Sequence, residues 1–402
     1  MKFALIKERK NPPDRRVVFS PEEAKNVIEK FPQAQIIAES SDIRIFSDSD
    51  YTNQEIEVTD DVSDCDVLIG VKEVPIDALI PNKKYFFFSH TIKKQPYNRK
   101  LLQAVLEKNI ELYDHETIVD SNNNRLIGFG YYAGVVGAYN TFRAFGLKFE
   151  LFNLPKAETL SDQQALVNVV KRHQLPPIKI VMTGGSGKVA RGIKDILDAV
   201  KIKEVSTHDF LTKTYDRPVY TKADVMDYNK RKDGQVLDKY DFYNNPTEYE
   251  SDFERFTKVA DVMITGHFYG NDAPFILTRE MLKAKDNKIR VVGDVSCDVD
   301  GPIACTLRAS TIVEPLYGYH PSEYKEVDYT HPAAITVMAV DNLPCELPKD
   351  ASEGFGKMFI EHVIPAFFNG DKDGILQRAK ITENGKLTEK FAYLQSYIED
   401  KI

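Results

Sequence analysis

Residues 178–192 read Ile178-Lys179-Ile180-Val181-Met182-Thr183-Gly184-Gly185-Ser186-Gly187-Lys188-Val189-Ala190-Arg191-Gly192. An apolar β-branched run therefore leads into a glycine turn, and the residues that follow predict a helix over 193–200. Glycine permits a tight turn and a close approach of the backbone to a diphosphate, while the helix N-terminus supplies N–H donors. Gly185-x-Gly187-x-x-Ala190 fits the dinucleotide fingerprint with alanine in the third position, and Gly184 offers a second register. The stretch predicts a dinucleotide site, with a purely structural strand–helix turn as the alternative.

The predicted cofactor site continues after the next strand, which is expected over 203–206. Asp209 lies about 20 residues beyond the glycines, where an acid accepts hydrogen bonds from the adenosine ribose of NAD. His208, with the basic residues of the turn, would instead suit a 2′-phosphate, so the predicted cofactor is NAD or NADP. The predicted cofactor-binding residues of this region are Gly184, Gly185, Ser186, Gly187, Lys188, Val189, His208 and Asp209.

Similar short apolar runs recur along the chain, separated by segments long enough for a helix. Their near-continuous hydrophobicity is typical of parallel strands that are covered on both faces. The pattern predicts an α/β fold of two Rossmann-like domains with parallel sheets and a cleft between them. The clearest runs are Phe3–Ile6, Ala34–Ala38, Val67–Val71, Tyr85–Phe88, Ile178–Met182, Val262–Thr265, Ile289–Gly293 and Ile335–Val340.

Two stretches are predicted to connect the domains. Gly128–Gly134 precedes an apolar helix expected over Val135–Phe145, and Tyr317–Pro332 is polar and aromatic with two prolines. We therefore predict a discontinuous substrate and catalytic domain, 1–134 plus 329–402, and a dinucleotide-binding domain, 135–328. The tyrosine-rich region 219–256 is interpreted as an elaboration of the second domain, either a lid or interface or a solvated excursion.

Composition excludes several classes of function. The 402 residues carry 53 Lys and Arg against 61 Asp and Glu, a net charge of −8, which argues against nucleic acid or an anionic membrane as the main partner. No apolar run approaches the roughly 20 residues of a membrane span, and charge interrupts the first apolar stretch too early for a signal peptide. Four scattered cysteines suggest neither disulfides nor a zinc site. We expect a cytoplasmic protein without a metal.

Three charged residues follow predicted strands directly: Lys72, His90 and Asp294. In open parallel sheets, ligands bind beyond the carboxyl ends of the strands, so Lys72 and His90 are expected at one sheet edge. Each also has a simpler explanation, because Lys72 and Glu73 could form a solvated pair and His90 could cap a helix. Arg16 is a candidate for gripping a substrate carboxylate. The remaining histidines singled out lack metal-ligand spacing and are interpreted as structural: His115, His173, His267 and His362.

Several stretches resemble the saccharopine dehydrogenase family, within the alanine dehydrogenase and transhydrogenase-like superfamily. The chain is especially similar to the lysine–ketoglutarate reductase half of the bifunctional aminoadipic semialdehyde synthase. The resemblance extends nearly end to end, and the Ser89-His90-Thr91-Ile92-Lys93 segment is its most specific part. The similar stretches are Asp14–Val17, Gly70–Glu73, Phe88–Lys93, Phe129–Gly134, Thr183–Val189, Asp294–Asp298 and Val340–Pro344.

The resemblance implies that Lys72 and His90 are the acid/base pair and that Arg16 binds a substrate carboxylate. It also implies that Glu73 and Lys93 tune the pair electrostatically. It places Asp294 near the nicotinamide, and Asp341 is added to the cofactor-binding residues. Tyr131 and Arg125 complete the predicted substrate-binding set of Arg16, Glu73, Lys93, Arg125 and Tyr131.

The activity that the resemblance implies is the interconversion of saccharopine with lysine and 2-oxoglutarate through an imine. Several sequential proton transfers suit two groups with pKa values near neutrality, and a lysine reaches that range through desolvation or a neighbouring cation. One alternative is an alanine dehydrogenase acting on pyruvate and ammonia, although Arg125 and Lys93 favour a substrate with more carboxylates. The other is a nucleotide-sensing protein without catalysis. Small-molecule substrates are the expected partners, with an oligomer possible.

Overall fold

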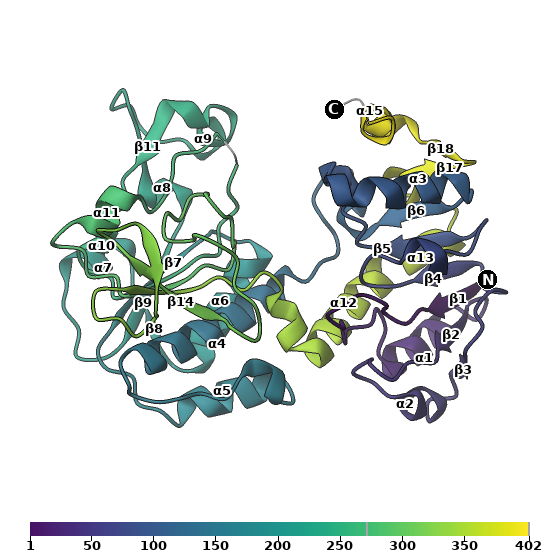
Figure 1. Ribbon diagram of the computed structural model, residues 1–402, viewed down its shortest axis with the longest axis horizontal. Coiled ribbons are helices and arrows are strands. Elements are labelled where there is room, and N and C mark those ends of the chain that lie inside the picture. Colours follow the sequence, from purple (N-terminus) through teal and green to yellow (C-terminus); the bar gives the residue numbers. More distant parts are fainter. Residues whose placement is uncertain (271, 401–402) are drawn as a thin grey trace. The chain divides into compact units, whose positions relative to one another are not determined.

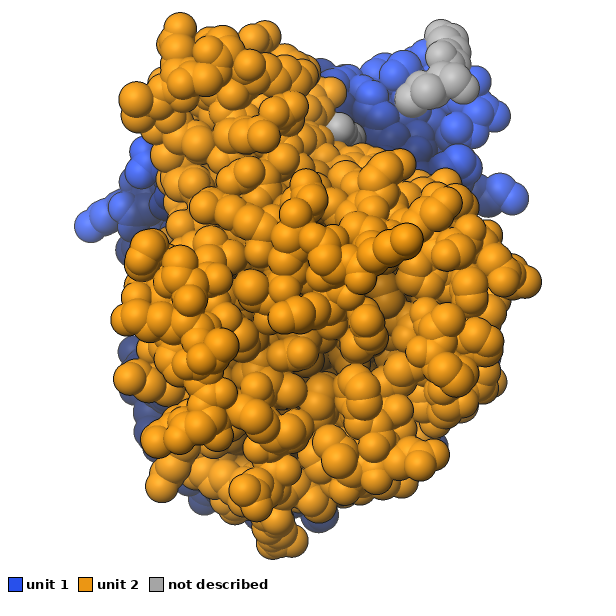
Figure 2. Space-filling model, turned by 90° about the vertical axis from the view of Figure 1, so that its left-hand side faces the viewer, with its two compact units in different colours: residues 1–129, 348–402 blue, residues 130–347 orange. Residues whose placement is uncertain are grey.

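The computed structural model describes residues 1–270 and 272–400 and divides the chain into two compact units. Unit 1 comprises Met1–Phe129 and Pro348–Ile402, and unit 2 comprises Gly130–Leu347 (Figure 1), coloured separately in Figure 2. The predicted α/β fold with two parallel-sheet domains is confirmed. The first boundary lies close to the predicted 134/135, whereas the second falls at 347/348 and not at 328/329.

Unit 1 is built on a six-stranded, wholly parallel sheet in the order β3-β2-β1-β4-β5-β6. This is the strand order of a doubly wound dinucleotide-binding sheet, which reverses direction beside its first strand. The inner strands are buried, as their continuous apolar sequences predicted. The strands are β1 Lys2–Leu5, β2 Gln35–Glu39, β3 Glu57–Thr59, β4 Val67–Ile69, β5 Lys84–Phe87 and β6 Glu111–Asp114.

Helices cover the sheet of unit 1, and several of them come from the C-terminal segment that follows unit 2 in the chain. The first helix starts where its sequence indicates, with Ser20 capping, Pro21 at the first position and Glu23 completing a capping box. The helices of unit 1 are α1 Pro21–Lys30, α2 Asp48–Thr52, α3 Arg99–Glu107, α12 Pro348–His362, α13 Ile364–Phe368, α14 Ile375–Ala379 and α15 Gln395–Ile398; the small β17–β18 hairpin is Thr382–Glu383 with Lys386–Leu387.

Unit 2 contains an eight-stranded sheet in the order β15-β14-β16-β13-β12-β7-β9-β8. Tyr317–Pro332, predicted as the link back to the first domain, instead forms the antiparallel β14–β15 hairpin at the edge of this sheet. Alternating tyrosines explain the error, because Tyr317 and Tyr319 are buried in the core. The strands are β7 Lys179–Thr183, β8 Lys203–Glu204, β9 Val219–Ala223, β12 Val262–Ile264, β13 Val291–Gly293, β14 Leu316–His320, β15 Lys325–Val327 and β16 Ile335–Met338.

Two long helices of unit 2, α4 and α6, pack backbone to backbone and lie side by side in Figure 1. A Cβ at Gly134 would lie 2.0 Å from the Val189 carbonyl oxygen, and a Cβ at Gly192 would lie 2.0 Å from that of Tyr131. Glycine is therefore required at both positions, and the helix after the dinucleotide turn is fixed firmly in place. The helices of unit 2 are α4 Gly130–Lys148, α5 Gln163–Lys171, α6 Lys188–Ala199, α7 Thr207–Thr212, α8 Val225–Tyr228, α9 Lys239–Asn244, α10 Glu254–Thr257 and α11 Arg279–Lys283.

The tyrosine-rich region of unit 2 is mostly integrated into the fold. Tyr220, Tyr228 and Tyr249 are buried, and the strands β10 (Asn229–Arg231) and β11 (Tyr249–Ser251) pair as a hairpin. Tyr240 and Tyr243 on α9 are exposed. The region therefore adds β9 to the sheet and a separate packed hairpin, with exposed aromatic residues on α9.

Candidate active site

The two predicted acid/base residues of unit 1 follow neighbouring strands at their carboxyl ends, and Asp114 ends the next strand. Lys72 follows β4 and His90 follows β5, and these strands are parallel neighbours joined beyond their ends by the Phe88 N–H to Val71 carbonyl hydrogen bond of 2.9 Å. Asp114, which ends β6, accepts hydrogen bonds from the backbone N–H groups of His90 (3.1 Å) and Glu116 (2.7 Å). One buried carboxylate therefore links the loops after β5 and β6.

Glu116 is the centre of the ionic cluster at this edge. Its carboxylate lies 3.2 Å from His90 Nδ1, 2.9 Å from Lys93 Nζ and 3.4 Å from Arg125 Nη2, and its side chain is 8% exposed. Burial by itself would raise the pKa of Glu116, but the hydrogen bonds from His90 and Lys93 and the nearby cations lower it to about 2. Glu116 is therefore an ionised carboxylate that fixes the orientation of the His90 ring.

His90 is held in an unusual backbone conformation, with φ of 54° and ψ of 12°. A left-handed conformation is uncommon for residues other than glycine and is typical of functional sites when the surroundings enforce it. The other ring nitrogen, Nε2, lies 3.9 Å from Glu73, which itself contacts Lys10 at 3.0 Å. His90 thus connects Glu116, in the 3₁₀ turn after β6, to Glu73 beside Lys72.

Glu8 positions the loop that carries Lys72. Its carboxylate accepts hydrogen bonds from the backbone N–H groups of Val71 (2.6 Å) and Lys72 (2.9 Å). Desolvation raises the pKa of Glu8 to about 8, although these two N–H groups favour its charged form. The charge of Lys72 in turn contributes to lowering the pKa of Asp14, which places the ammonium near the loop after β1.

Arg16 is buried in an ion pair instead of projecting freely. Its guanidinium contacts Asp14 in bidentate fashion at 3.0 and 2.6 Å and lies 4.2 Å from the centre of the Phe129 ring. Burial would raise the pKa of Asp14, but Arg16 lowers it to about 2. A substrate carboxylate would share Arg16 with Asp14, so the predicted role of Arg16 stays a prediction.

In unit 2, the glycine turn has the form that a diphosphate requires. Gly184 has a φ of 104°, and a Cβ there would lie 2.4 Å from the Gly266 carbonyl oxygen, so only glycine fits. A Cβ at Gly187, the N-cap of α6, would meet nothing within 4 Å. The turn therefore leaves open space against the N-terminus of a twelve-residue helix, which fits a dinucleotide diphosphate.

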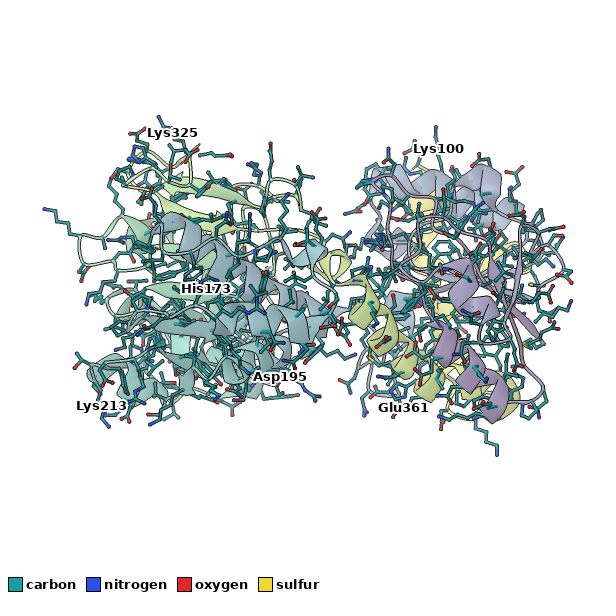
Figure 3. The ribbon with its side chains drawn as sticks, turned by 90° about the horizontal axis from the view of Figure 1, so that it is seen from below. Lys100, His173, Asp195, Lys213, Lys325 and Glu361 are labelled. Carbon is teal, nitrogen blue, oxygen red and sulfur yellow. The ribbon has the colours of Figure 1, made fainter. Side chains whose placement is uncertain are left out.

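The structure changes the candidate for the ribose-binding acid. The strand beside β7 is β9, while β8, which precedes Asp209, lies beyond it at the sheet edge. Asp209 pairs with Lys213 (labelled in Figure 3) at 2.8 Å on the surface of α7. Asp224 instead follows β9 directly, and its Oδ2 would lie 2.7 Å from a Cβ at Gly185. Asp224, paired with Lys239 at 2.7 Å, faces the turn in place of Asp209; His208 is exposed on α7 with Asp209.

Three other predicted residues of unit 2 have distinct surroundings. Asp294 is fully buried after β13 and accepts hydrogen bonds from the hydroxyls of Thr265, Ser296 and Thr306. Asp341 is exposed after β16. The Tyr131 hydroxyl donates to Asp195 (labelled in Figure 3) at 2.9 Å, on the face between α4 and α6. Asp294 therefore organises a loop, and Tyr131 belongs to unit 2 and not to the Glu116 cluster.

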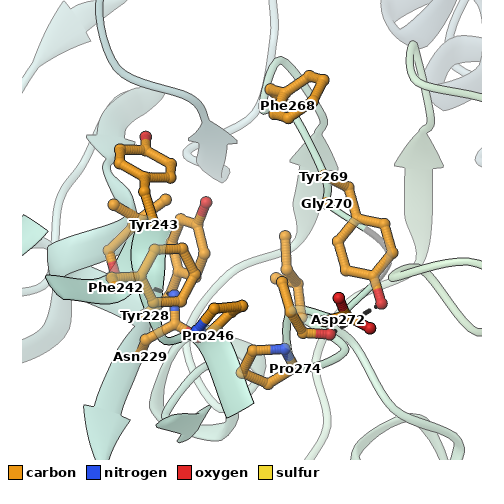
Figure 4. A pocket seen from close by; sticks show the side chains of 13 residues that line it. Tyr228, Asn229, Phe242, Tyr243, Pro246, Phe268, Tyr269, Gly270, Asp272 and Pro274 are labelled. Carbon is orange, nitrogen blue, oxygen red and sulfur yellow. Dashed lines mark hydrogen bonds between the residues drawn. The ribbon is translucent and has the colours of Figure 1, made fainter. Parts of the chain in front are cut away.

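An aromatic cavity of about 210 Å³ lies beyond the carboxyl ends of β9 and β12 (Figure 4). Val225, next to Asp224, contributes to one side, and the residues after Thr265 contribute to the other. Figure 4 shows the rings of Tyr228, Tyr243 and Tyr269 around this space. Its Val225 wall directly follows Asp224 in the chain, beyond the end of β9.

Sequence reasoning missed two central residues, Glu116 and Asp224. Both follow strands directly, which is the signal that identified Lys72 and His90. However, β6 has an acidic residue at each of its ends, which leaves no continuous apolar run, and β9 lies in the region that was interpreted as an elaboration. Neither strand was predicted, so neither acid stood out.

A glycine turn of this geometry in a doubly wound sheet, with a second α/β unit beside it in the chain, defines a two-domain dinucleotide-binding protein. Two family models match the chain: alanine dehydrogenase/PNT, N-terminal domain, over residues 4–136, and alanine dehydrogenase/PNT, C-terminal domain, over residues 217–390. Together they cover about three quarters of the chain. The chain belongs to the alanine dehydrogenase/PNT family.

Among curated relatives, the chain is 27% identical to "Alpha-aminoadipic semialdehyde synthase, mitochondrial" of Rattus norvegicus, covering 99% of this chain and 48% of that protein. It is 23% identical to "Saccharopine dehydrogenase [NAD(+), L-lysine-forming]" of Yarrowia lipolytica, covering 82% of this chain and 83% of that protein. The chain thus spans about half the length of the first of these relatives. The resemblance predicted from the sequence is confirmed, and the NAD(+) in the Yarrowia enzyme's name agrees with the predicted cofactor, NAD or NADP.

Among solved structures, an L-alanine dehydrogenase superposes with a TM-score of 0.65 at 17% identity, covering 100% of both chains. A transhydrogenase from Sinorhizobium meliloti superposes with a TM-score of 0.57 at 14% identity, covering 96% of this chain and 100% of that chain. These structures share the two-domain fold. No helix within residues 1–270 and 272–400 combines the length and the apolar composition that crossing a bilayer requires.

Proposed function

We propose that the chain is a nicotinamide-dependent oxidoreductase that interconverts saccharopine with lysine and 2-oxoglutarate. The observation that carries the proposal is the cluster of Lys72, His90 and Glu116 at one sheet edge of a chain that also holds a dinucleotide turn. The names of the relatives support the substrate assignment, since both aminoadipic semialdehyde synthase and saccharopine dehydrogenase belong to lysine chemistry.

The proposed reaction needs several proton transfers and one hydride transfer. The lysine side-chain nitrogen adds to the ketone carbon of 2-oxoglutarate, and the resulting carbinolamine loses water to give an imine. The nicotinamide, when bound, supplies the hydride that reduces the imine carbon, and a proton completes the secondary amine. Lys72 and His90 would protonate the departing hydroxyl and accept protons from the attacking amine.

The surroundings of His90 suit this role. Glu116 accepts from Nδ1, which fixes the ring and leaves Nε2 as the atom that exchanges protons. Glu73, 3.9 Å from Nε2, is near enough to compensate a positive charge on the ring. Glu8 sets the direction of the Lys72 loop through two backbone hydrogen bonds.

Lys93 and Arg125 would bind the substrate's carboxylates. Each side chain is about half exposed although its cationic end contacts Glu116, so a carboxylate could approach from solvent. Arg16 would supply a further cation through its pair with Asp14. A substrate with several carboxylates, rather than pyruvate, accounts for this many cations.

On the cofactor side, Asp224 favours NAD over NADP, because a carboxylate accepts from a ribose hydroxyl and repels a 2′-phosphate. The aromatic cavity beside Asp224 would receive the adenine ring, whose faces stack on aromatic side chains. Gly187 would let the diphosphate approach the first turn of α6.

The test is the oxidation of NADH and of NADPH with lysine plus 2-oxoglutarate, run beside pyruvate plus ammonium. We expect turnover with the first pair of substrates and a preference for NADH. Turnover only with pyruvate plus ammonium would replace the substrate assignment by alanine dehydrogenation. Tight binding of NADH without turnover on either pair would identify a nucleotide sensor.

A further inference from the structure

A buried ring nitrogen of His267 in unit 2 has no hydrogen-bond partner among the residues that the structure describes. His267 follows β12 and is 9% exposed, and its Nε2 makes no hydrogen bond with any residue in 1–270 or 272–400. An unpaired buried N–H or ring nitrogen costs about 1–3 kcal/mol, so such atoms in native structures point to a missing partner. The sequence analysis interpreted this histidine as structural, which leaves the orphaned nitrogen unexplained.

The hydrogen bonds around His267 define which nitrogen carries the proton. Burial lowers the pKa of His267 to about 4, although Asp294 counteracts it, so the ring is neutral at pH 7 and carries one N–H. Nδ1 lies 2.7 Å from Thr183 Oγ1, which also accepts from the Gly266 N–H at 3.2 Å. Within the described residues these are the two partners of the Thr183 hydroxyl, and Nδ1 is the one that can accept its hydrogen. The proton of the ring is therefore on Nε2, which is a buried donor.

This donor lies at the dinucleotide turn. Thr183 is the last residue of β7 and precedes Gly184, and the close approach of Gly184 to the Gly266 carbonyl joins the ends of β7 and β12. Asp224 flanks the turn from β9, on the opposite side of β7. The aromatic cavity is lined by Phe268, Tyr269 and Gly270, and His267 is not among its lining residues.

We propose that His267 Nε2–H donates a hydrogen bond to an oxygen of the nicotinamide ribose of the bound cofactor. A neutral donor fixed by Thr183 suits an oxygen acceptor, and the half of the dinucleotide beyond the diphosphate is the part that β12 faces. His267 is thus a positioning residue for the end of the cofactor that transfers hydride. The inference rests on the proposed nicotinamide cofactor.

The test compares His267→Gln with His267→Asn, because the glutamine amide reaches the place of Nε2 whereas the asparagine amide reaches the place of Nδ1. We expect the Asn variant to bind NADH about tenfold more weakly than the wild type, and the Gln variant to remain within about threefold. Binding of ADP, which lacks the nicotinamide half, should change less than about twofold in both variants. Kd is measured by calorimetry on the full chain, with thermal unfolding recorded for each variant.

Three outcomes would overturn the inference: equal NADH affinities of the Asn variant and the wild type, equal losses in the Gln and Asn variants, or parallel losses for NADH and ADP. The last two would mean that His267 only supports the fold. If the wild-type protein binds ADP but neither NADH nor NADPH, the proposed function itself fails, which is distinct from a failure confined to the variants.

Discussion

Two buried carboxylates, one in each unit, have opposite properties. Glu116 in unit 1 is surrounded by His90, Lys93 and Arg125, and its pKa falls to about 2. Glu346 in unit 2, on the 3₁₀ turn Leu343–Glu346, accepts a hydrogen bond from the Asn140 amide at 2.9 Å, and burial raises its pKa to about 7. Burial disfavours both charges, so the difference lies in the partners: cations keep Glu116 ionised, while a neutral amide cannot do so for Glu346.

The same contrast extends to the rest of each site. Unit 1 gathers ionised groups in mutual contact, which is an arrangement that can pass protons. In unit 2, Asp294 accepts from hydroxyl and backbone groups, the glycine turn offers backbone N–H donors, and His267 is neutral. Under the proposed function, this difference corresponds to a division between proton transfer in unit 1 and cofactor binding in unit 2, and substitutions in each unit can test it.

The largest effect is expected for Lys72→Met. Loss of an acid/base group should lower kcat by about 10³-fold, while the Kd for NADH stays within about twofold because Lys72 lies outside the dinucleotide-binding unit. Lys100→Met, on the exposed face of α3 (labelled in Figure 3), is the matched control and should leave both quantities unchanged. An unchanged kcat in Lys72→Met would remove Lys72 from the mechanism, and a weaker Kd for NADH would end the proposed division.

Asp224→Ala should change cofactor preference more than any other substitution in unit 2. Removing the carboxylate loses the ribose contact and leaves Lys239 to meet a 2′-phosphate, so the NADPH-to-NADH affinity ratio should rise about 50-fold. Asp209→Ala serves as control, since Asp209 contacts Lys213 on α7. A change in preference caused by Asp209→Ala alone would restore the candidate indicated by sequence spacing.

The two glutamates test the electrostatic contrast directly through stability. The pKa of Glu116 lies below its ordinary 4.5. The ionised carboxylate therefore adds to the free energy of unfolding above pH 4.5, and this contribution is lost as the pH falls toward 2. Glu116→Gln should therefore lower the free energy of unfolding by about 2 kcal/mol at pH 7 and have little effect near pH 2.

Glu346→Gln should have the opposite sign. Its pKa lies above 4.5, so the folded wild-type protein favours the protonated carboxyl. The free energy of unfolding of the wild type therefore falls as the pH rises from 4.5 through 7. The amide keeps the acceptor for Asn140 without a charge, so stability should increase by about 2 kcal/mol at pH 8 and remain unchanged at pH 4. Urea unfolding of both variants at several pH values measures these changes in the free energy of unfolding. Changes of the same sign in the two variants at pH 8 would contradict the difference between the two carboxylates.

The smallest effect on function is expected at the glycine turn. A methyl group at Gly187 enters open space, so Gly187→Ala should leave the unfolding temperature unchanged and weaken NADH binding about tenfold by obstructing the diphosphate. Gly184→Ala is the comparison, because its φ of 104° and the contact with the Gly266 carbonyl make the cost structural, about 1–3 kcal/mol of stability. Unaltered NADH affinity in Gly187→Ala would place the diphosphate elsewhere.

Much of the fold was predictable because its signals are local. The runs at Val67–Val71 and Ile178–Met182 became β4 and β7, and the capping box of Ser20 and Glu23 starts α1. The hairpin at Tyr317–Pro332 was not predicted, because its burial comes from the neighbouring strand β16 and not from a continuous apolar sequence of its own. The site followed the same rule: Lys72 and His90 follow continuous apolar runs, whereas Glu116 follows a strand with an acidic residue at each end.

The sequence by itself determined the glycine turn, the strands before the charged residues and the family, because these depend on short-range spacing and on residue type. Tertiary structure alone decided that β9 lies beside β7, so that Asp224 and not Asp209 is the candidate for the ribose-binding acid. It also decided that Glu116 contacts three basic side chains. It further decided that a histidine interpreted as structural has a buried ring nitrogen with no hydrogen-bond partner within residues 1–270 and 272–400. Strand neighbours and buried polar contacts arise from burial across the whole sheet, and no window of local sequence contains that information.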